Sequence, residues 1–482
     1  MPRARKNTSQ HTRQILLWAW VSLLLGSLLW PLAAPGELLL RDMAVVDDPA
    51  LSLSALGFGD LPSRNAPQDG VLALLGLPGL IPVSWVVRVL LVAAGLAGAW
   101  GAMQLGRAQF AATTVALYNP FVVERLLQGH WSLVLAAWLL PLVVALRAHP
   151  RAQIVAMWAA SLTPTGAVIA GVVAVVTSRR RVLTSVFVLL AWLPWLVPAL
   201  LSTPTSGGAQ AFSVRAEAGV GTIGTVLGLG GIWNAGVVPA SREAGFAVAG
   251  VVLFGVLLAG VRHCPPVLLI LGVVGLVAAL GTWALPGFTS WLVTHVPGAG
   301  LFRDSQKLLM LAIPAYVSMA AGLNRPLQWA AVVLSLLQVP DAPREVEALR
   351  PSSSNTAELA KLAAGRDVLI VGAPTLVLRD DDLPVVDPRA KAVSLVESGE
   401  LRVDGIITDP PSPRWTGAVD AWAHRDLDRL RELGVGVVID GKDVVETGAG
   451  PQRGWRFHLG LGLTVFWLLL PLGLVLVRRR QR

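Results

Sequence analysis

Runs of about 20 apolar residues recur along the chain, and no other feature constrains its fold as strongly. A helix needs about 20 consecutive apolar residues to cross the hydrocarbon core of a bilayer. Only 14% of the 482 residues are charged, whereas soluble domains have about 25%. The low charge argues against a soluble enzyme and against a disordered chain, which would be polar. The sequence therefore predicts a polytopic α-helical membrane protein.

Twelve apolar segments define the predicted membrane region. They lie at 15–33, 82–104, 108–122, 131–146, 153–162, 166–177, 182–201, 244–261, 266–285, 308–323, 327–339 and 456–477. The first segment is too long for a signal-peptide core and has no clear cleavage pattern, so we expect an uncleaved span. The segments at 308–323 and 327–339 are short. As re-entrant segments they would still leave both termini on the same side.

The short segments at 153–162 and 166–177 are predicted to form two helices with a break between them. Pro164 and Gly166 are typical of such a break. One continuous helix would place Arg151 and Arg179 on opposite sides of the membrane, against the positive-inside rule. Two helices meeting at 163–166 place both basic ends on the cytoplasmic side.

Charge separates between the two sides of this topology. The predicted cytoplasmic side holds 16 basic residues and no acidic residue: Arg3, Arg5, Lys6, Arg13, Arg107, Arg147, Arg151, Arg179, Arg180, Arg181, Arg262, Arg325, Arg478, Arg479, Arg480 and Arg482. All 30 carboxylates fall on the other side. We therefore predict a multi-pass protein of the plasma (inner) membrane with both termini cytoplasmic. Because this topology accounts for the net charge of +9, we expect no nucleic-acid partner.

Three outer loops and one larger block make up the other side. The predicted transmembrane region, residues 1–339, has outer loops at 34–81, 202–243 and 286–307. The block at 340–454 carries 20 carboxylates and 14 basic residues and is predicted to be a small extracytoplasmic α/β domain. Residues 455–482 are predicted to form a C-terminal transmembrane helix and a basic cytoplasmic tail.

The predicted elements of the 340–454 block follow its apolar pattern. Strands are expected at 367–371, 405–408 and 435–440. A helix is expected at 418–433, ended by Gly434.

The first polar cluster lies in the first outer loop. Asp42, Asp47 and Asp48 follow soon after the first span, beside Arg41. Clustered carboxylates serve as a general base or hold a divalent cation. The alternative is a solvated turn before Pro49 with an aspartate capping a helix.

The second cluster is YNPFVVERLLQGHW, residues 118–131, where Glu124, Arg125 and His130 interrupt an apolar stretch. Asn119 followed by Pro120 predicts the start of a helix. Glu124 and Gln128 then share one helical face. The alternative is an interfacial helix anchored by aromatic residues at its two ends.

The third cluster is GAGLFRDSQKLLML, residues 298–311. Arg303 and Lys307 are four residues apart where the chain re-enters the membrane. Two cations on one helical face at the lipid boundary suit a lipid-borne phosphate. The alternative is snorkelling of both side chains at the end of a span.

Other features carry less weight. Arg88 lies inside a span, Arg215 lies in a Gly-rich outer loop, and His295 precedes Val-Pro-Gly. The lone Cys264 excludes an intramolecular disulfide and a multi-cysteine metal site. No Walker motif, HExxH or Gly-x-Ser-x-Gly is present, which disfavours an ATPase, a zinc protease and a serine hydrolase. We predict no dedicated metal site and leave open a divalent cation.

Several features together resemble the polyprenyl-phosphate-sugar glycosyltransferases of the GT-C superfamily. These proteins have many spans, an acidic first outer loop and a pair of short helices broken at a TKPTG-like corner before a basic run. The corner here is SLTPTGAVIAGVVAVVTSRRR, residues 161–181, which lacks the usual basic residue. Within the superfamily, residues 118–131 resemble the NP-x-V-x-ER-x-x-x-GHW stretch of the actinobacterial α-(1→3)-arabinofuranosyltransferase D type. Residues 66–70, 301–307 and 430–440 are also similar to that type.

The resemblance implies an inverting glycosyltransferase for cell wall biogenesis. It would move a sugar, arabinofuranose being favoured, from a polyprenyl-phosphate donor in the membrane lipid to an extracytoplasmic cell-envelope glycan. By this hypothesis Asp42 is the base, with Asp47 or Asp48 as substitutes. Arg303 and Lys307 hold the donor phosphate, helped by Arg125 or Arg215. Glu124 and His130 shape the sugar or acceptor site.

A different class of protein remains as an alternative, namely a non-catalytic scaffold for envelope assembly or a flippase for lipid-linked sugars. A flippase requires polar groups through the membrane midplane. The predicted spans have almost none, which favours an enzyme that works at one face.

Overall fold

The computed structural model describes residues 2–77, 79, 81–202, 209–296, 299–403 and 405–479. Arg480 and Arg482 of the predicted basic tail lie outside the described residues. Within the described residues, six helices are long and apolar enough to cross a bilayer. They are α1 (Pro2–Leu29), α3 (Val83–Met103), α6 (Trp131–Ala145) together with the 3-10 turn η2 (Leu146–Ala148) that continues it, α9 (Arg181–Leu201), α12 (Pro266–Ala284) and α21 (Trp455–Arg479).

The other six predicted segments form shorter helices, so twelve full-length spans are not confirmed. These helices are α4 (Gln109–Leu117), α7 (Pro150–Ala159), α8 (Pro164–Thr177), α11 (Ala247–Leu258), α14 (Ile313–Ala321) and α15 (Arg325–Leu337). The prediction of one segment over 108–122 is wrong, because the backbone of Tyr118 and Asn119 is extended and ends α4 before the next helix begins.

The helix pair predicted to break at 163–166 is confirmed. Thr163 has an extended backbone between the 3-10 turn that follows α7 and the first residue of α8. The side chain of Gln153, near the start of α7, donates to the hydroxyl of Thr177, the last residue of α8, at 2.9 Å. The two helices are therefore antiparallel, and Arg151 and Arg179 lie at the same end of the pair.

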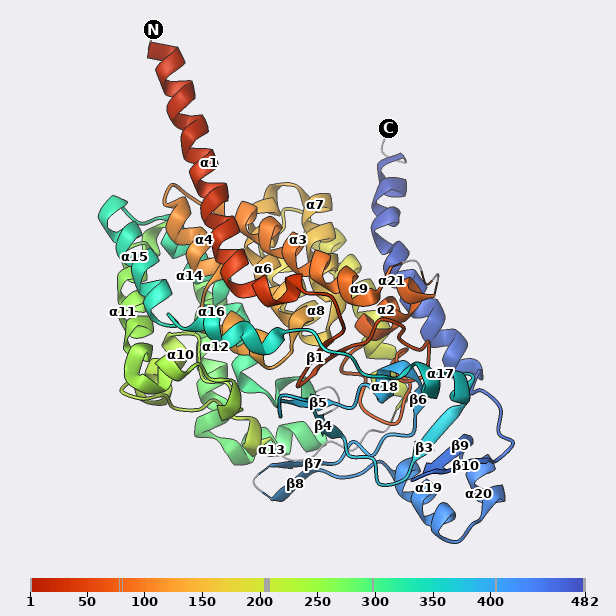
Figure 1. The fold of residues 1–482 in the computed structure, drawn as a ribbon. Coiled ribbons are helices and arrows are strands. Elements are labelled where there is room, and N and C mark those ends of the chain that lie inside the picture. The colour runs from red at the N-terminus through yellow and green to blue at the C-terminus, as the bar shows by residue number, and fades with distance from the viewer. Residues whose placement is uncertain are drawn as a thin grey trace.

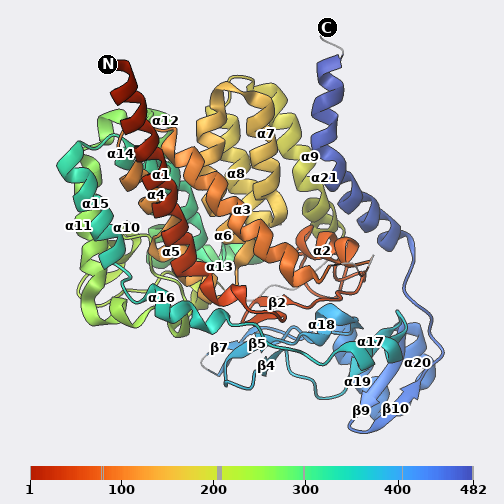
Figure 2. The same ribbon diagram turned by 45° about the horizontal axis from the view of Figure 1, so that its top comes forward.

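The molecule has two chemically different ends (Figures 1 and 2). The start of α1 and the last described turn of α21 lie at one end, and the strands lie at the other. At the end with the termini, Arg13 donates to the carbonyl of Arg107 at 2.8 Å, and the ring of His263 lies 2.7 Å from the carbonyl of Leu105. The N-terminal part of α1 and the segment at 261–263 therefore both contact the loop at 105–107, and all three belong to the predicted cytoplasmic side. That this end faces the cytoplasm stays a prediction.

The helical layer is held by close backbone contacts. A Cβ atom added to Gly98 of α3 would lie 2.0 Å from the carbonyl oxygen of Trp138, and one added to Gly101 would lie 2.4 Å from the backbone nitrogen of Leu142. Small residues at such positions let helices in a membrane pack against each other's backbone. The α3–α6 pair forms the centre on which the neighbouring helices pack.

Short helices and turns line the strand-bearing end. They are α2 (Gln68–Gly76), α5 (Pro120–Leu127), α10 (Gly221–Leu227), α13 (Pro286–His295), α16 (Ala342–Glu345), and the 3-10 turns η8 (Ala299–Phe302) and η9 (Ser305–Leu311). A π-helical turn, η6 (Arg242–Phe246), precedes α11.

Two hairpins from distant parts of the chain form one layer at this end. β1 (Leu38–Leu40) and β2 (Met43–Val45) pair antiparallel in the first loop, and β4 (Leu376–Leu378) and β5 (Pro384–Val386) pair in the 340–454 block. The backbone of Arg41 donates to Pro384 at 2.7 Å and accepts from Val386 at 2.8 Å. The block therefore contributes directly to the structure of the first loop.

The remaining strands of the block form a small mixed sheet and a third hairpin. The sheet has the order β10-β9-β3-β6, with β3 (Asp367–Ile370) parallel to β9 (Val435–Asp440) and β6 (Ser394–Leu395), and β10 (Asp443–Glu446) antiparallel to β9. β7 (Leu401–Val403) pairs with β8 (Ile406–Asp409). Helices α17 (Ala357–Ala363), α18 (Arg389–Ala392), α19 (Pro413–Ala423) and α20 (Leu427–Glu432) complete the block.

The predicted strands of the block are confirmed, but the single helix at 418–433 is wrong. Arg425 has a left-handed backbone (φ +56°) and separates α19 from α20. Asp426 then caps α20 by accepting from the backbone of Arg429 at 2.9 Å. Gly434 follows α20 with φ +72°, as its predicted role of ending the helix requires.

Candidate functional site

Asp42 occupies the turn of the β1–β2 hairpin, where other elements fix it. Its backbone N–H donates to the carbonyl of Gln128 at 3.1 Å. Its Oδ2 atom accepts from the side-chain amide of Gln128 at 2.8 Å and lies 2.9 Å from Nε2 of His130. The Asp42 side chain remains 41% exposed. One carboxylate oxygen is thus held by protein groups while water reaches the side chain.

The motif at 118–131 packs against this turn. Gly129 has φ +85°, and a Cβ atom there would lie 2.4 Å from both the carbonyl of Leu40 and the backbone nitrogen of Met43. The neighbouring Arg41 donates to the carbonyls of Leu127 at 2.9 Å and Gly236 at 2.7 Å. The glycine of the motif is therefore required for the hairpin to approach the end of α5.

Helix α5 begins as predicted and is buried along its length. The Asn119 side chain accepts from the backbone of Val122, and Pro120 is the first helical residue. Arg125 is fully buried and forms a bidentate pair with Asp304 at 2.5 and 2.7 Å. A guanidinium nitrogen of Arg125 also lies 3.1 Å from Nδ1 of His130. The helix thus delivers His130 with one ring nitrogen already occupied.

The two basic residues that follow η8, Arg303 and Lys307, pair with different carboxylates. Lys307 in η9 lies 3.6 Å from a carboxylate oxygen of Asp304. Arg303 instead binds Asp409 at 2.5 and 3.0 Å and stacks over the ring of Phe212 at 4.1 Å. The expectation that Arg303 and Lys307 share one helical face is wrong, because the 3-10 helix begins at Ser305, after Arg303.

We define the Asp42 cluster as the charged and polar side chains that interact around the hairpin turn. Its members are Asp42, Arg64, Arg125, Gln128, His130, Asp304 and Lys307. Arg64 joins it from the first loop: it lies 3.4 Å from Asp409, is 52% exposed on its side chain, and interacts electrostatically with Asp42 and Lys307.

Electrostatics favour the anionic form of both carboxylates in the cluster. Burial alone would raise the pKa of Asp42, but the hydrogen bond and charge of His130, with help from Gln128 and Lys307, hold that pKa below its usual value. Burial is likewise outweighed at Asp304, where Arg125 and Lys307 hold the pKa far below the usual range. Both groups are carboxylates at neutral pH.

The pKa values of two basic members, Lys307 and His130, are lowered as well, which for a base favours the neutral form. Burial lowers the pKa of Lys307, and the charge of Arg125 adds to the effect while Asp304 opposes it. Burial also lowers the pKa of His130, and its contact with Asp42 opposes this only in part. Within the described residues, the Lys307 ammonium forms no hydrogen bond, so its N–H groups can bind an anion.

Several residues predicted for the site lie apart from this cluster. Asp47 accepts from the backbone of Ser84 at 3.3 Å at the start of α3, which is the capping alternative. Asp48 is exposed on the surface. Arg215 is half-buried, and in the described part of the chain its side chain forms no hydrogen bond or ion pair with a cluster member.

Glu124 belongs to a second, fully buried network. It accepts from the backbone of Ile232 at 3.1 Å and from the side chain of Gln306. Arg242 lies 3.6 Å away and pairs with Glu217. Burial, with the charge of Glu217, raises the pKa of Glu124. The Glu124 side chain is 0% exposed, so in this conformation it cannot touch a sugar.

Two lesser candidates have structural explanations. Arg88 donates to the backbone carbonyls of Leu32, Ala34 and Gly36 at 2.6 to 2.9 Å. These carbonyls, where the chain leaves the first span, stabilise the charge of Arg88. His295 is exposed and stacks on Trp291 at 5.5 Å between ring centroids.

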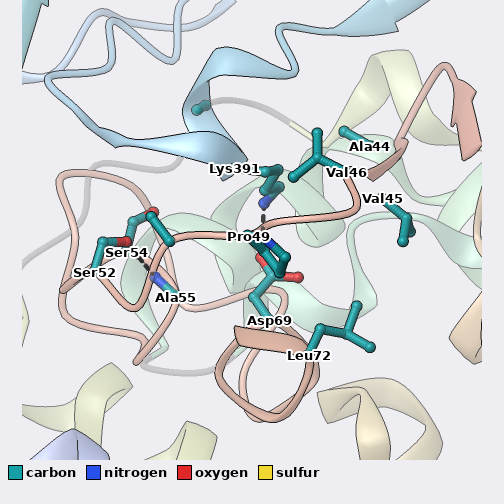
Figure 3. Close-up of a pocket in the computed structure, with 12 residues that line it drawn as sticks. Ala44, Val45, Val46, Pro49, Ser52, Ser54, Ala55, Asp69, Leu72 and Lys391 are labelled. Carbon is teal, nitrogen blue, oxygen red and sulfur yellow. Dashed lines mark hydrogen bonds and ion pairs between the residues drawn. The ribbon is translucent and has the colours of Figure 1, made fainter. Parts of the chain in front are cut away.

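A small pocket lies beside the hairpin, between the first loop, α2 and α18 (Figure 3). Lys391 and Asp69 point toward each other across it and form an ion pair at 2.7 Å. The pocket has about 20 Å³ for water-sized molecules, which is room for about one water and too little for a sugar ring. Lys391 also interacts electrostatically with Asp42. We therefore assign the residues of the pocket to holding the Asp42 cluster in place and not to binding a substrate.

Sequence reasoning missed Arg64 and the partners of Arg303. Arg64 lies in a polar loop with no local motif, and Asp409 is the last residue of β8 in the distant block. Neither residue has a spacing that indicates a site. Among the described residues, no group of three or more His, Cys, Asp or Glu side chains could hold a metal ion.

Comparisons with known proteins support the fold. A cryo-electron microscopy structure of a mutant of arabinofuranosyltransferase AftD from Mycobacteria is similar, with a TM-score of 0.53 and 16% sequence identity. The match covers 90% of this chain but only 37% of the AftD chain. Searches of protein-family models and of curated proteins find no match. At this identity the likeness concerns the fold alone: this chain shares the fold of the matched part of the AftD chain.

Proposed function

We propose that this protein is a membrane glycosyltransferase that moves a sugar from a polyprenyl-phosphate donor to a cell-envelope glycan outside the membrane. Arabinofuranose is the favoured sugar, since the similar fold belongs to an arabinofuranosyltransferase. The observation that carries the proposal is the Asp42 cluster: a partly exposed carboxylate beside a lysine whose N–H groups can bind an anion.

Asp42 is the proposed general base. Two donors hold Oδ2, and among the described residues none donates to Oδ1. In the reaction, Oδ1 takes the proton from the acceptor hydroxyl as the hydroxyl oxygen forms a bond to the anomeric carbon. The bond from that carbon to the phosphate oxygen breaks, and its electron pair leaves with the lipid phosphate. A positioned base contributes about 10²–10⁴-fold to such a step.

Lys307 and Arg64 are the proposed phosphate ligands. Both are cations close enough to Asp42 to interact with it, and both keep exposed surface, 23% at Lys307 and 52% at Arg64. Arg125 and Arg303 are each committed to a buried carboxylate by two hydrogen bonds. We therefore assign these two arginines to positioning, in place of the direct phosphate contact that their charge suggests.

The strand-bearing end is the proposed extracytoplasmic side of the plasma membrane. It carries the Asp42 cluster and the acidic 340–454 block, while the basic loops meet at the other end (Figure 1). The donor would lie in the outer part of the bilayer with its phosphate at Lys307, and the glycan would approach from the block.

The test is sugar transfer by protein in lipid nanodiscs. Polyprenyl-phosphoryl arabinose or mannose, radiolabelled in the sugar, is supplied with an envelope oligosaccharide. We expect transfer by the wild type, loss in Asp42→Asn, and no change in Asp48→Asn, a matched control in the same loop. Full activity in Asp42→Asn would overturn the base assignment. No transfer with either donor by folded protein would favour a scaffold or a flippase.

A further inference from the structure

We infer that His130 is a positioning residue, which Arg125 holds as the neutral imidazole with its proton on Nε2, so that it binds Asp42 as a hydrogen-bond donor. Three contacts, which link Asp42 to His130, His130 to Arg125 and Arg125 to Asp304, support this inference. Nε2 of His130 lies 2.9 Å from Oδ2 of Asp42, Nδ1 lies 3.1 Å from a nitrogen of Arg125, and Arg125 is bidentate to Asp304.

The direction of these hydrogen bonds follows from the chemistry of arginine. A guanidinium group has only donors. A nitrogen of Arg125 at 3.1 Å from Nδ1 therefore requires an acceptor lone pair on Nδ1, and an Nδ1–H would face another N–H. The ring proton must then sit on Nε2, where it donates to Asp42. A protonated imidazolium would lose the Arg125 contact.

The charged groups around His130 point the same way. Asp42 reaches it from the hairpin, Arg125 from α5, and Asp304 and Lys307 from the start of η9. Asp42 favours the charged ring, whereas Lys307, Arg125 and the partial loss of solvent around the ring oppose it; the His130 side chain is 20% exposed. Asp304 neutralises Arg125 but is shared with Lys307. The balance lowers the pKa of His130 and leaves Asp42 as the anionic partner.

This arrangement defines the work of each group in the proposed transfer. His130 and Gln128 both bind Oδ2, which fixes the plane of the Asp42 carboxylate and leaves Oδ1 for the acceptor. His130 has no vacant nitrogen with which to accept a proton. Its role therefore differs from that of a histidine general base, and only this role in transfer rests on the proposed function.

The tautomer can be measured without any sugar. Nitrogen-15 labelled histidine is incorporated into the full chain in nanodiscs, and the signal of His130 among the seven histidines is identified as the one lost in His130→Gln. Solid-state NMR then distinguishes the two neutral forms and the imidazolium by their nitrogen shifts. We expect the neutral form protonated at Nε2 at pH 7. Protonation at Nδ1, or an imidazolium, would overturn the inference.

A kinetic comparison tests the role if transfer is found. His130→Gln keeps a side-chain N–H donor near Asp42, whereas His130→Phe keeps the volume and loses the donor. Positioning predicts that Gln retains most of kcat with an unchanged pH profile and that Phe loses it. If His130 itself were the base, both variants would lose about 10²–10⁴-fold. Absence of transfer in the wild type would contradict the proposed function and leave the NMR result standing.

Discussion

The two ionic networks on either side of α5 differ in how far solvent reaches their charged side chains. Around Glu124, the side chains of Arg242 and Glu217 are 0% and 3% exposed and are paired to one another. Around Asp42, the carboxylate and Lys307 remain partly exposed and have hydrogen-bonding capacity left. A buried pair stabilises the fold only as long as both partners are present, whereas a half-exposed group can bind a substrate. Within the motif at 118–131, Glu124 therefore belongs to the buried network that we assign to stability, and His130 belongs to the exposed network that we propose for sugar transfer.

The largest effect is expected from the exposed carboxylate. Asp42→Asn should reduce sugar transfer by about 10²–10⁴-fold, because the amide cannot take the acceptor's proton. The same variant should keep the thermal stability of the wild type, since the partly exposed side chain is replaced by one of the same shape. Transfer rates and the temperature of loss of folded protein by size exclusion, measured together, check this. If Asp42→Asn lowered the temperature at which folded protein is lost as well as the transfer rate, the distinction between the two networks would fail.

The buried network should show the reverse pattern. Arg242→Ala leaves Glu217 buried without its partner, and we expect about 3–5 kcal/mol of destabilisation, seen as loss of folded protein at lower temperature. The double variant Glu217→Gln with Arg242→Met removes both charges at once and should recover most of that stability. If the double variant is no more stable than Arg242→Ala, charge pairing is not what holds this region.

The lysine of the Asp42 cluster should affect donor binding. Lys307→Gln removes one charge-assisted hydrogen bond, worth about 1.5–3 kcal/mol, and should lower kcat/KM for the lipid donor by about 10- to 100-fold. Arg215→Gln is the matched control, since that arginine has no tie to the cluster in the described structure. Donor titrations check both. An unchanged kcat/KM in Lys307→Gln would remove it from the phosphate site.

The last expected effect is a dependence of the free energy of unfolding on pH. It comes from Glu397 in the 340–454 block, which interacts electrostatically with Lys391 of the small pocket. Burial raises the pKa of Glu397 to about 7, with Asp60 and Asp69 adding to the shift and Lys391 opposing it. A carboxyl whose pKa is raised on folding binds more protons in the folded state, so stability falls as pH rises from about 4.5 to about 7. We expect a change of about 2–3 kcal/mol, absent in Glu397→Gln, from thermal unfolding at pH 5 and pH 8. An identical slope in both proteins would assign the effect elsewhere.

Local patterns predicted local structure well. Asn119 and Pro120 set the start of α5, and the break at Thr163 follows from Pro164 and the placement of arginines around it. The prediction of one helix over 418–433 failed because the left-handed Arg425 and the capping residue Asp426 lie inside an otherwise helical pattern. A sequence pattern without cap geometry does not distinguish a break from a continuous helix.

The site depended on contacts that no local pattern carries. Three of the aspartates in the first loop lie close together in sequence, and only the hairpin register places Asp42 in the turn beside His130 while Asp47 caps α3. Arg303 was expected at the phosphate, yet its partner Asp409 comes from a distant strand. Charge and position along the chain singled out segments that the structure brings together at Asp42, but the division between buried pairs and exposed groups is decided by tertiary packing.

The pairing of Arg41 with Pro384 and Val386 has a consequence for biosynthesis. Ribosomes make the hairpin early and its partner strand late, after most of the helices. The turn that presents Asp42 therefore stays unfinished until the 340–454 block has been made and has docked on it. By the proposed function, a chain released prematurely would lack an assembled turn at Asp42 and could not consume the sugar donor.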